Sequence, residues 1–306
     1  MATSDGFIAR SLDRIRMYVD EPTSNAKYTD AKILDLLENQ WANILSEMSR
    51  VSQHPFVVRH NITFGEASRT YVLPPNVGNI LRLASINTTS NAPEWIVVPL
   101  SRNNPGGPGI SMEGNILRLE PDWKGEDTTY QLDYIPTGDV RLHAGTAGTI
   151  TNDSTAGTCT LVLAATPTTG VLDNRPNAYA GSILRILSAT ANNYVQERII
   201  SSYDVTTRTA TLRPHFEADL LPSGAVTYEI APLLWQASDM VVAVAVAKVI
   251  AGIEGDSKRF NALHQQYAVE IRRLRLGAAN FDQIKGITFR HDVPTNRRYA
   301  EWGNYA

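Results

Sequence analysis

The chain has 306 residues, of which 43% are apolar and 19% are charged, and its formal net charge is −3. This composition is typical of a folded globular protein and excludes a disordered chain, and the length suits about two domains. The small negative charge provides no overall field that would attract nucleic acid or an anionic membrane. The single cysteine, Cys159, excludes an intramolecular disulfide framework and a zinc site built on cysteines.

Residues 1–53 predict two amphipathic helices. Apolar residues recur at steps of three and four, first from Phe7 to Val19 and then from Ile33 to Met48. Thr29 is a suitable N-cap for the second helix. Because each apolar stripe must be buried against another element, two helices alone form an incomplete bundle.

Residues 54–139 predict a β domain, because the apolar period changes from helical spacing to two. Tyr130, Leu132 and Tyr134 alternate with polar residues, as they do in a half-buried strand. The stretch SMEGNILRLEP predicts a hairpin that turns at Gly114-Asn115.

Residues 140–231 are richer in Thr, Ala, Gly and Asn and predict an inserted β module. Segments such as SILRILS, ERIISSYD, TRTATLRP and VTYEIAP have the length and spacing of strands in a small barrel or sandwich. Cys159 lies in one such segment, where a small buried strand residue is the ordinary interpretation.

Residues 232–280 predict two further helices. The first is apolar on nearly all sides, which indicates burial all round. Asp256 is a suitable N-cap for the second, whose stripe runs from Phe260 to Leu274. We expect its last turn to carry three cations: Arg272, Arg273 and Arg275. The predicted fold class is therefore α+β, with a four-helix bundle formed from both ends of the chain.

Residues 281–306 predict an extended C-terminal arm, since they carry no apolar repeat at helical spacing. Aromatic residues and arginine are the types that anchor protein interfaces. Either the segment folds back on its own bundle, or it gains order only when it docks on another molecule. The aromatic residues of this kind in the segment are Phe289, Tyr299, Trp302 and Tyr305.

The sequence offers little for catalysis. Its six histidines have no metal-ligand spacing, and NNPGGPGI lacks the Gly-Lys-Ser/Thr of a phosphate loop. A pair of carboxylates for glycosidase chemistry would need a spatial pairing that sequence cannot show. The candidates for it are Glu94, Glu113, Asp122 and Asp133. We therefore expect no enzyme activity, no metal and no cofactor.

The order of these segments resembles the head-to-tail connector, or adaptor, proteins of tailed bacteriophages. The residues that carry the resemblance are the helix YTDAKILDLLENQWANILSEMSRV, the β segments YVLPPNVGNILRL and GNILRLEPDW, and the closing helical pair with its projecting arm. The stretch from NAYAGSILRI to VTYEIAP is also similar to a β module that recurs in phage virion proteins. Many members of the family are shorter, so the 140–231 module is a departure from it.

The resemblance implies a structural virion protein, made in the host cytoplasm, that forms a homo-oligomeric ring, usually of twelve copies. Such a ring joins the portal protein to a tail or nozzle protein and surrounds a channel for DNA, which passes without specific binding. It also implies that the arm, residues 281–306, contacts the portal. The residues expected to make this contact are Arg290, Arg297, Arg298, Tyr299, Trp302 and Tyr305. The alternatives are another phage tail or tube protein, or a glycan-binding or glycan-cleaving virion β protein. No membrane role is expected, because the most apolar run, about 14 residues long, is too short to span a bilayer.

Overall fold

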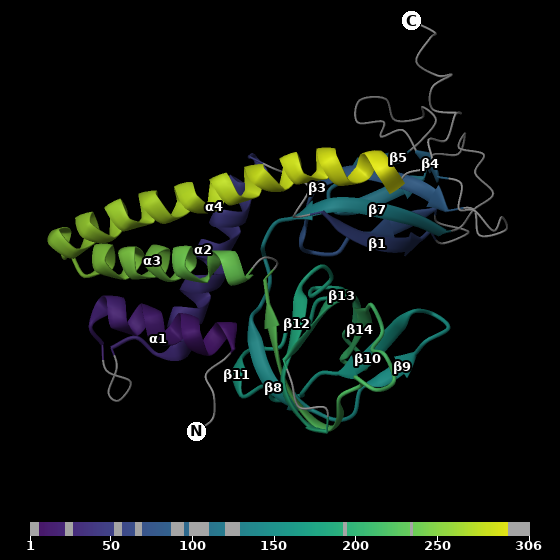
Figure 1. Cartoon of the computed structure of the whole chain (residues 1–306), viewed down its shortest axis with the longest axis horizontal. Helices are drawn as coiled ribbons and strands as arrows, with labels where there is room; N and C mark the ends of the chain where they lie inside the picture. The colour runs from purple at the N-terminus through teal and green to yellow at the C-terminus, as the bar shows by residue number, and fades with distance from the viewer. Residues whose placement is uncertain are drawn as a thin grey trace, which may run out of the picture.

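The computed structural model describes residues 6–21, 27–51, 57–64, 69–86, 95–97, 110–119, 129–191, 195–232 and 235–292. The described residues form four α-helices and fifteen β-strands, so the fold is α+β, as predicted. The strands make three antiparallel sheets, of four, eight and three strands. Figure 1 shows the helices of residues 7–49 and 235–253 on one side of the molecule and two β parts, residues 57–136 and 143–231, on the other. The long helix of residues 257–292 extends from the helical side across the view toward the first β part.

The helices come from both ends of the chain: α1 (Phe7–Val19), α2 (Asp30–Ser49), α3 (Trp235–Ile253) and α4 (Ser257–Asp292). The apolar stripes predicted for α1 and α2 are buried throughout. Thr29 caps α2 by accepting a hydrogen bond from the backbone N–H of Lys32, and Asp256 caps α4 through the N–H of Arg259. Both predicted caps are therefore confirmed.

α3 is the central helix. Its residues from Val241 to Ala247 are almost completely buried, and it packs against α1, α2 and α4. This environment explains why its sequence is apolar on nearly every side, since a helix that is covered all round has no polar face. In the described part of the chain, no helix is both long and apolar enough to cross a membrane.

α4 is longer than predicted. It continues through Arg272, Arg273 and Arg275, so these cations do not lie in a last turn. Gly277 does not end the helix, because a glycine inside a helix costs only about 1 kcal/mol.

The predicted extended arm is also corrected by the length of α4. Residues 281–292 are helical and belong to α4, whereas residues 293–306 lie outside the described residues. An arm that begins at the end of α4 is therefore shorter than the sequence indicated.

The strands that follow α2, up to residue 136, form two small sheets. The four-stranded sheet has the order β1-β7-β3-β4, and the three-stranded sheet has the order β2-β6-β5. Their bounds are β1 (Val58–Thr63), β2 (Thr70–Val72), β3 (Val77–Ile86), β4 (Trp95–Val97), β5 (Ile110–Glu113), β6 (Ile116–Leu119) and β7 (Thr129–Pro136). The predicted hairpin joins β5 to β6, and Gly114 has a φ of 60°, which glycine adopts readily.

The remaining strands form one curved eight-stranded sheet with the order β11-β8-β15-β12-β13-β14-β10-β9 (Figure 1). The bounds are β8 (His143–Ala147), β9 (Thr151–Asp153), β10 (Thr158–Val162), β11 (Thr169–Gly170), β12 (Ile183–Ala191), β13 (Gln196–Asp204), β14 (Thr209–Arg213) and β15 (Ser223–Ala231). Of the two predicted alternatives, a barrel or a sandwich, the closed barrel is wrong. Among the described strands, β9 and β11 end the sheet without pairing with each other, so it does not close.

The described residues have two apolar cores. The larger core is continuous from the four helices into the eight-stranded sheet, and the smaller one lies between the four-stranded and three-stranded sheets. The helices and the eight-stranded sheet therefore stabilise each other directly, while β1 to β7 enclose a core of their own.

Candidate interaction surfaces

The structure places one of the six predicted portal-contact residues. Arg290 lies two residues before the end of α4, and its side chain is outside the described residues. The other five lie beyond α4, also outside the described residues: Arg297, Arg298, Tyr299, Trp302 and Tyr305. The contacts expected of these residues remain predictions.

α4 carries apolar side chains on two faces. Leu263 and Ile271 are buried against the core. Val269 and Leu276 are 50% and 59% exposed, and their spacing of seven places them on one face, turned away from the core. These two exposed apolar side chains, on the face opposite the buried stripe, make this face of α4 a candidate contact surface.

Glu229 joins the eight-stranded sheet to the start of α1. Its carboxylate accepts hydrogen bonds from the backbone N–H groups of Phe7, at 2.6 Å, and Ile8, at 3.1 Å. Glu229 also forms a buried ion pair with Arg185, whose Nε lies 2.8 Å from Glu197 Oε1. A carboxylate at a helix N-terminus satisfies free N–H groups and matches the helix dipole. This arrangement is structural, because every partner is part of the chain.

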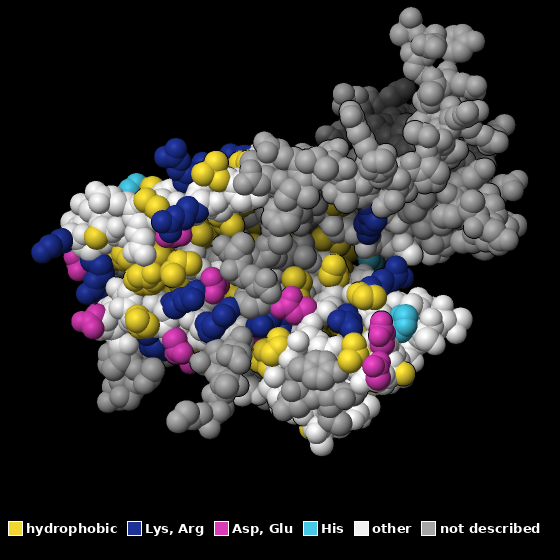
Figure 2. Space-filling view, in the orientation of Figure 1, with side chains coloured by type: hydrophobic (Ala, Val, Ile, Leu, Met, Phe, Trp, Pro, Cys, Tyr) yellow, Lys and Arg dark blue, Asp and Glu magenta, His cyan; other side chains and the backbone are white. Residues whose placement is uncertain are grey.

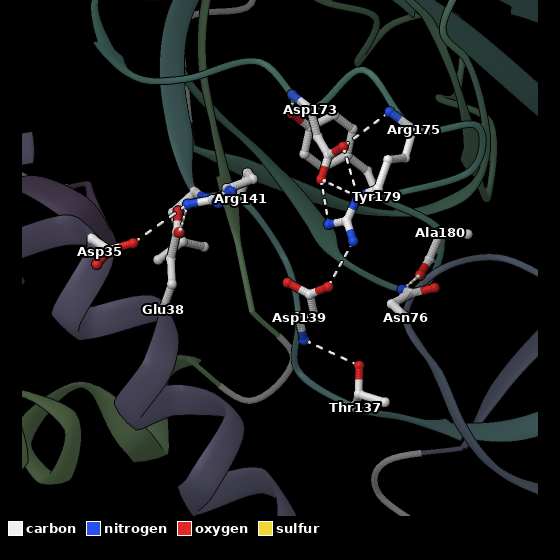
Figure 3. Close-up of polar contacts among 11 residues, drawn as sticks. Asp35, Glu38, Asn76, Thr137, Asp139, Arg141, Asp173, Arg175, Tyr179 and Ala180 are labelled. Carbon is white, nitrogen blue, oxygen red and sulfur yellow. Dashed lines mark hydrogen bonds and ion pairs between the residues drawn. The ribbon is translucent and has the colours of Figure 1, made fainter.

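A second set of polar contacts connects α2 to the segment before β8 (Figure 3). Arg141 Nη1 lies 2.9 Å from Glu38 Oε2 and 3.6 Å from Asp35 Oδ1. Glu38 also accepts a hydrogen bond of 2.7 Å from the backbone N–H of Leu142. Burial raises the pKa of the Glu38 carboxyl, although its hydrogen bond to Leu142 and the charge of Arg141 act in the opposite direction.

Arg175 is the centre of a neighbouring network (Figure 3). Its Nη1 lies 2.7 Å from Asp139 Oδ2 and its Nη2 lies 2.7 Å from Asp173 Oδ2, while the backbone N–H of Asp173 donates to the Tyr179 hydroxyl. Hydrogen bonds to the two aspartates raise the pKa of the guanidinium. An open groove of about 620 Å³ lies over these residues and Arg141. Because its cations are already paired, we assign the groove a structural role.

A cleft between the two β parts differs from this groove because its lining has more arginines than carboxylates. It has a volume of about 620 Å³ and is lined by residues of β1, β3, β7, β13 and β14 and their flanking turns. The lining includes three arginines and one carboxylate: Arg59, Arg82, Arg213 and Asp133. Figure 2 shows Lys and Arg side chains along the boundary between the β parts on the face in view. This surplus of positive charge makes the cleft the strongest candidate binding site in the described part of the chain.

Asp133 was one of the four carboxylates considered for glycosidase chemistry. It forms ion pairs with Arg82, at 2.7 Å, and with Arg59, at 3.9 Å. Glu113 lies exposed at the end of β5, in the other sheet of the smaller core, and Glu94 and Asp122 are outside the described residues. Asp133 is therefore paired with arginines, and none of the other candidate carboxylates is placed beside it among the described residues.

Burial favours the neutral forms of two histidines and of the cysteine: His60, His143 and Cys159. Burial lowers the pKa of His60, and it lowers the pKa of His143 to about 4. It raises the pKa of the Cys159 thiol to about 11, against the effect of Arg198. A thiol that keeps its proton at neutral pH is a poor nucleophile. No group of three metal-ligating side chains occurs among the described residues.

The sequence does not predict that the three cleft arginines lie together. Arg59, Arg82 and Arg213 belong to three strands, are separated by up to 154 positions, and meet only when the two β parts pack together. Each one, taken alone, is an ordinary surface residue of a strand. The alternation along each strand indicates on which face each arginine lies. It does not indicate which strand faces lie opposite each other in the fold.

No protein-family model matches this chain, and no curated protein matches it either.

Proposed function

We propose that this chain is a structural protein of a bacteriophage virion, a head-to-tail connector that forms a ring between the portal and the tail. The ring, of twelve copies in the proposal, gives passage to genomic DNA. The observation that carries the proposal is the design of α4. This 36-residue helix packs against the central α3, exposes a second apolar face, and leads into the aromatic and arginine-rich residues 293–306.

The helices are the proposed ring-forming part, a four-helix bundle built from both ends of the chain. At a rise of about 1.5 Å per residue, α4 is roughly 54 Å long and α3, with 19 residues, roughly 28 Å. α4 therefore extends well beyond the helix that supports it. Val269 and Leu276 would contact a neighbouring copy, which binds with a different patch. Head-to-tail contacts of this kind close into a ring when the rotation between copies divides a full turn evenly.

The C-terminal residues are the proposed portal anchor. Asp292 is the last residue of α4, and Arg297, Arg298, Tyr299 and Trp302 follow within ten positions. A segment that gains order on binding must offset a loss of conformational entropy, and buried aromatic side chains are well suited to do so. Arginine adds hydrogen bonds to acidic or carbonyl groups of the partner.

The overall charge suits a channel for DNA. With a net charge of −3, the protein lacks the large positive charge that would bind DNA through its phosphates. Passage without specific binding is therefore compatible with the composition. The eight-stranded sheet and its loops would lie outside the ring in this proposal.

Mass measurement tests the proposal. The full chain and a chain that ends at Asp292 are each examined alone and with the portal protein of the same phage. The proposal predicts a ring-sized complex with the portal for the full chain, and for the shorter chain a folded protein that no longer binds. A full chain that stays monomeric with the portal and binds or degrades a surface polysaccharide would favour the glycan alternative.

A further inference from the structure

The cleft between the two β parts is held in a fixed shape by close contacts. Gly181 has a φ of 85°, and a Cβ at this position would lie 2.5 Å from Val58 Cγ2. His60 Nδ1 lies 2.9 Å from the carbonyl oxygen of Ser201 on β13. The two walls therefore touch at the floor of the cleft and hold the residues above it in place. A preformed site loses less free energy to ordering when it binds a ligand.

The charge of the cleft is not balanced by its own residues. Three arginines and one aspartate give the lining a net charge of +2. Asp133 is buried and is already engaged by Arg82 Nη2 and by Gln131 Nε2, both at 2.7 Å. The side chain of Arg59 is 70% exposed, and Arg213 forms no ion pair with any residue that the structure describes. At least two guanidinium groups are therefore available to an incoming anion.

The walls of the cleft are apolar. Val57, Val58, Leu81 and Ile199 line it together with the arginines, and Ile199 is 49% exposed although it lies on a strand with neighbours on both sides. A volume of about 620 Å³ is within the range of sites that enclose a small ligand or a few side chains. Apolar walls with a few converging polar groups are typical of such sites.

We propose that this cleft binds an acidic peptide segment of a partner protein, in which an Asp or Glu carboxylate follows or precedes an apolar side chain. The carboxylate pairs with the guanidinium groups of Arg59 and Arg213, and the apolar side chain packs on Ile199. Guanidinium and carboxylate groups can form two parallel hydrogen bonds, which fixes the direction of the peptide. The proposal rests on the cleft alone and does not depend on the chain being a connector.

Nucleic acid fits the same surface less well. Phosphate backbones are bound by cations spread along a track, whereas the three arginines here line one cleft. The apolar wall formed by Val57, Leu81 and Ile199 offers no contact to phosphate. A carboxylate beside an apolar group matches both components of the lining.

The test is a selection from a library of random 12-residue peptides on the immobilised full-length protein. We expect the selected peptides to be enriched in Asp or Glu next to apolar residues. The strongest is then synthesised, and its Kd is measured by fluorescence anisotropy against variants. Arg59→Gln and Arg213→Gln should each raise the Kd about tenfold. Arg118→Gln, which removes an exposed arginine from β6, should leave it within about twofold.

A variant that should change the Kd in the opposite direction and a nucleic-acid competitor complete the test. Asp133→Asn removes the carboxylate that competes for Arg82, so it should lower the Kd. Thermal unfolding checks that each variant is folded. The proposal is overturned if no peptide is selected, if the selected peptides lack acidic residues, or if Arg59→Gln and Arg213→Gln bind as the wild type does. It is also overturned if a twelve-nucleotide oligodeoxythymidylate displaces the peptide with equal affinity, because the cleft is then a nucleic-acid site.

Discussion

The carboxylate of Glu229 accepts a hydrogen bond of 2.6 Å from the backbone N–H of Phe7, which lies 222 positions earlier in the chain. Because Glu229 belongs to β15 and Phe7 begins α1, this bond attaches the helices to the eight-stranded sheet. Gly6, the N-cap of α1, has no side chain with which to cap the helix. The carboxylate of a distant strand takes over that function.

Glu229→Gln is expected to lower the free energy of unfolding by about 3 kcal/mol, because it leaves the buried Arg185 without its main partner. Urea denaturation at pH 7 measures this loss. Glu113→Gln is the control, since Glu113 is exposed at a hairpin, and it should change the free energy by less than about 0.5 kcal/mol. Equal effects of the two variants would show that the capping carboxylate contributes nothing.

Stability is expected to depend on pH through His143. Its side chain is buried and its pKa is about 4, compared with about 6.5 for a histidine in an unfolded chain. The unfolded state therefore takes up a proton first as the pH falls. The stability that the neutral ring contributes is complete above pH 6.5 and is lost between pH 6.5 and about 4, at up to about 1.4 kcal/mol per pH unit.

His143→Phe isolates this contribution, because it keeps an aromatic ring among Tyr179 and Tyr228 and removes the titration. Urea denaturation of both proteins at pH 7, 6 and 5 gives the comparison. The wild type should lose more stability than the variant with each step downward, by an amount approaching about 1.4 kcal/mol per unit. Parallel curves for the two proteins would contradict the prediction.

Cys159 is expected to resist thiol reagents in the folded protein. It is completely buried, and a pKa of about 11 leaves roughly one thiol in a thousand ionised at pH 8. Modification by a disulfide reagent should be more than about a hundredfold slower in buffer than in 6 M urea, because the thiol reacts only after the sheet opens. Rapid modification in buffer would show that β10 is accessible in the folded state.

The exposed face of α4 is expected to mediate contact between copies. Val269→Asp and Leu276→Asp should each prevent ring formation with the portal and change the free energy of unfolding by less than about 0.5 kcal/mol. Met112→Asp is the matched control, because Met112 is 54% exposed on β5, in a sheet that belongs to the smaller apolar core and not to the helical one. Analytical ultracentrifugation measures assembly. Rings formed equally well by all three variants would exclude this face.

Much of the fold could be predicted from local patterns. The stripes of α1 and α2, the caps at Thr29 and Asp256, and the turn at Gly114 depend only on nearby residues. Helix spacing, capping and glycine turns act over a few positions, so they can be identified without knowledge of the fold. These elements occur where the sequence predicted them.

The remaining features depend on contacts between distant segments. Along β15, the side chains of Glu229 and its neighbour Tyr228 lie on opposite faces of the sheet. The face that carries a charged residue is commonly exposed, but here α1 docks on it and bonds to Glu229. Similarly, Arg59 and Arg213 line the same cleft only because the two β parts meet. The predicted barrel failed for a related reason, because strand spacing does not determine whether a sheet closes.

Cryo-electron microscopy of intact phage particles that contain this chain tests the proposed connector role most directly. We expect a ring of this protein at the vertex that bears the tail, with α4 of each copy against its neighbour and residues 293–306 in contact with the portal. Density that places those residues against their own chain, or the protein away from that vertex, would contradict it.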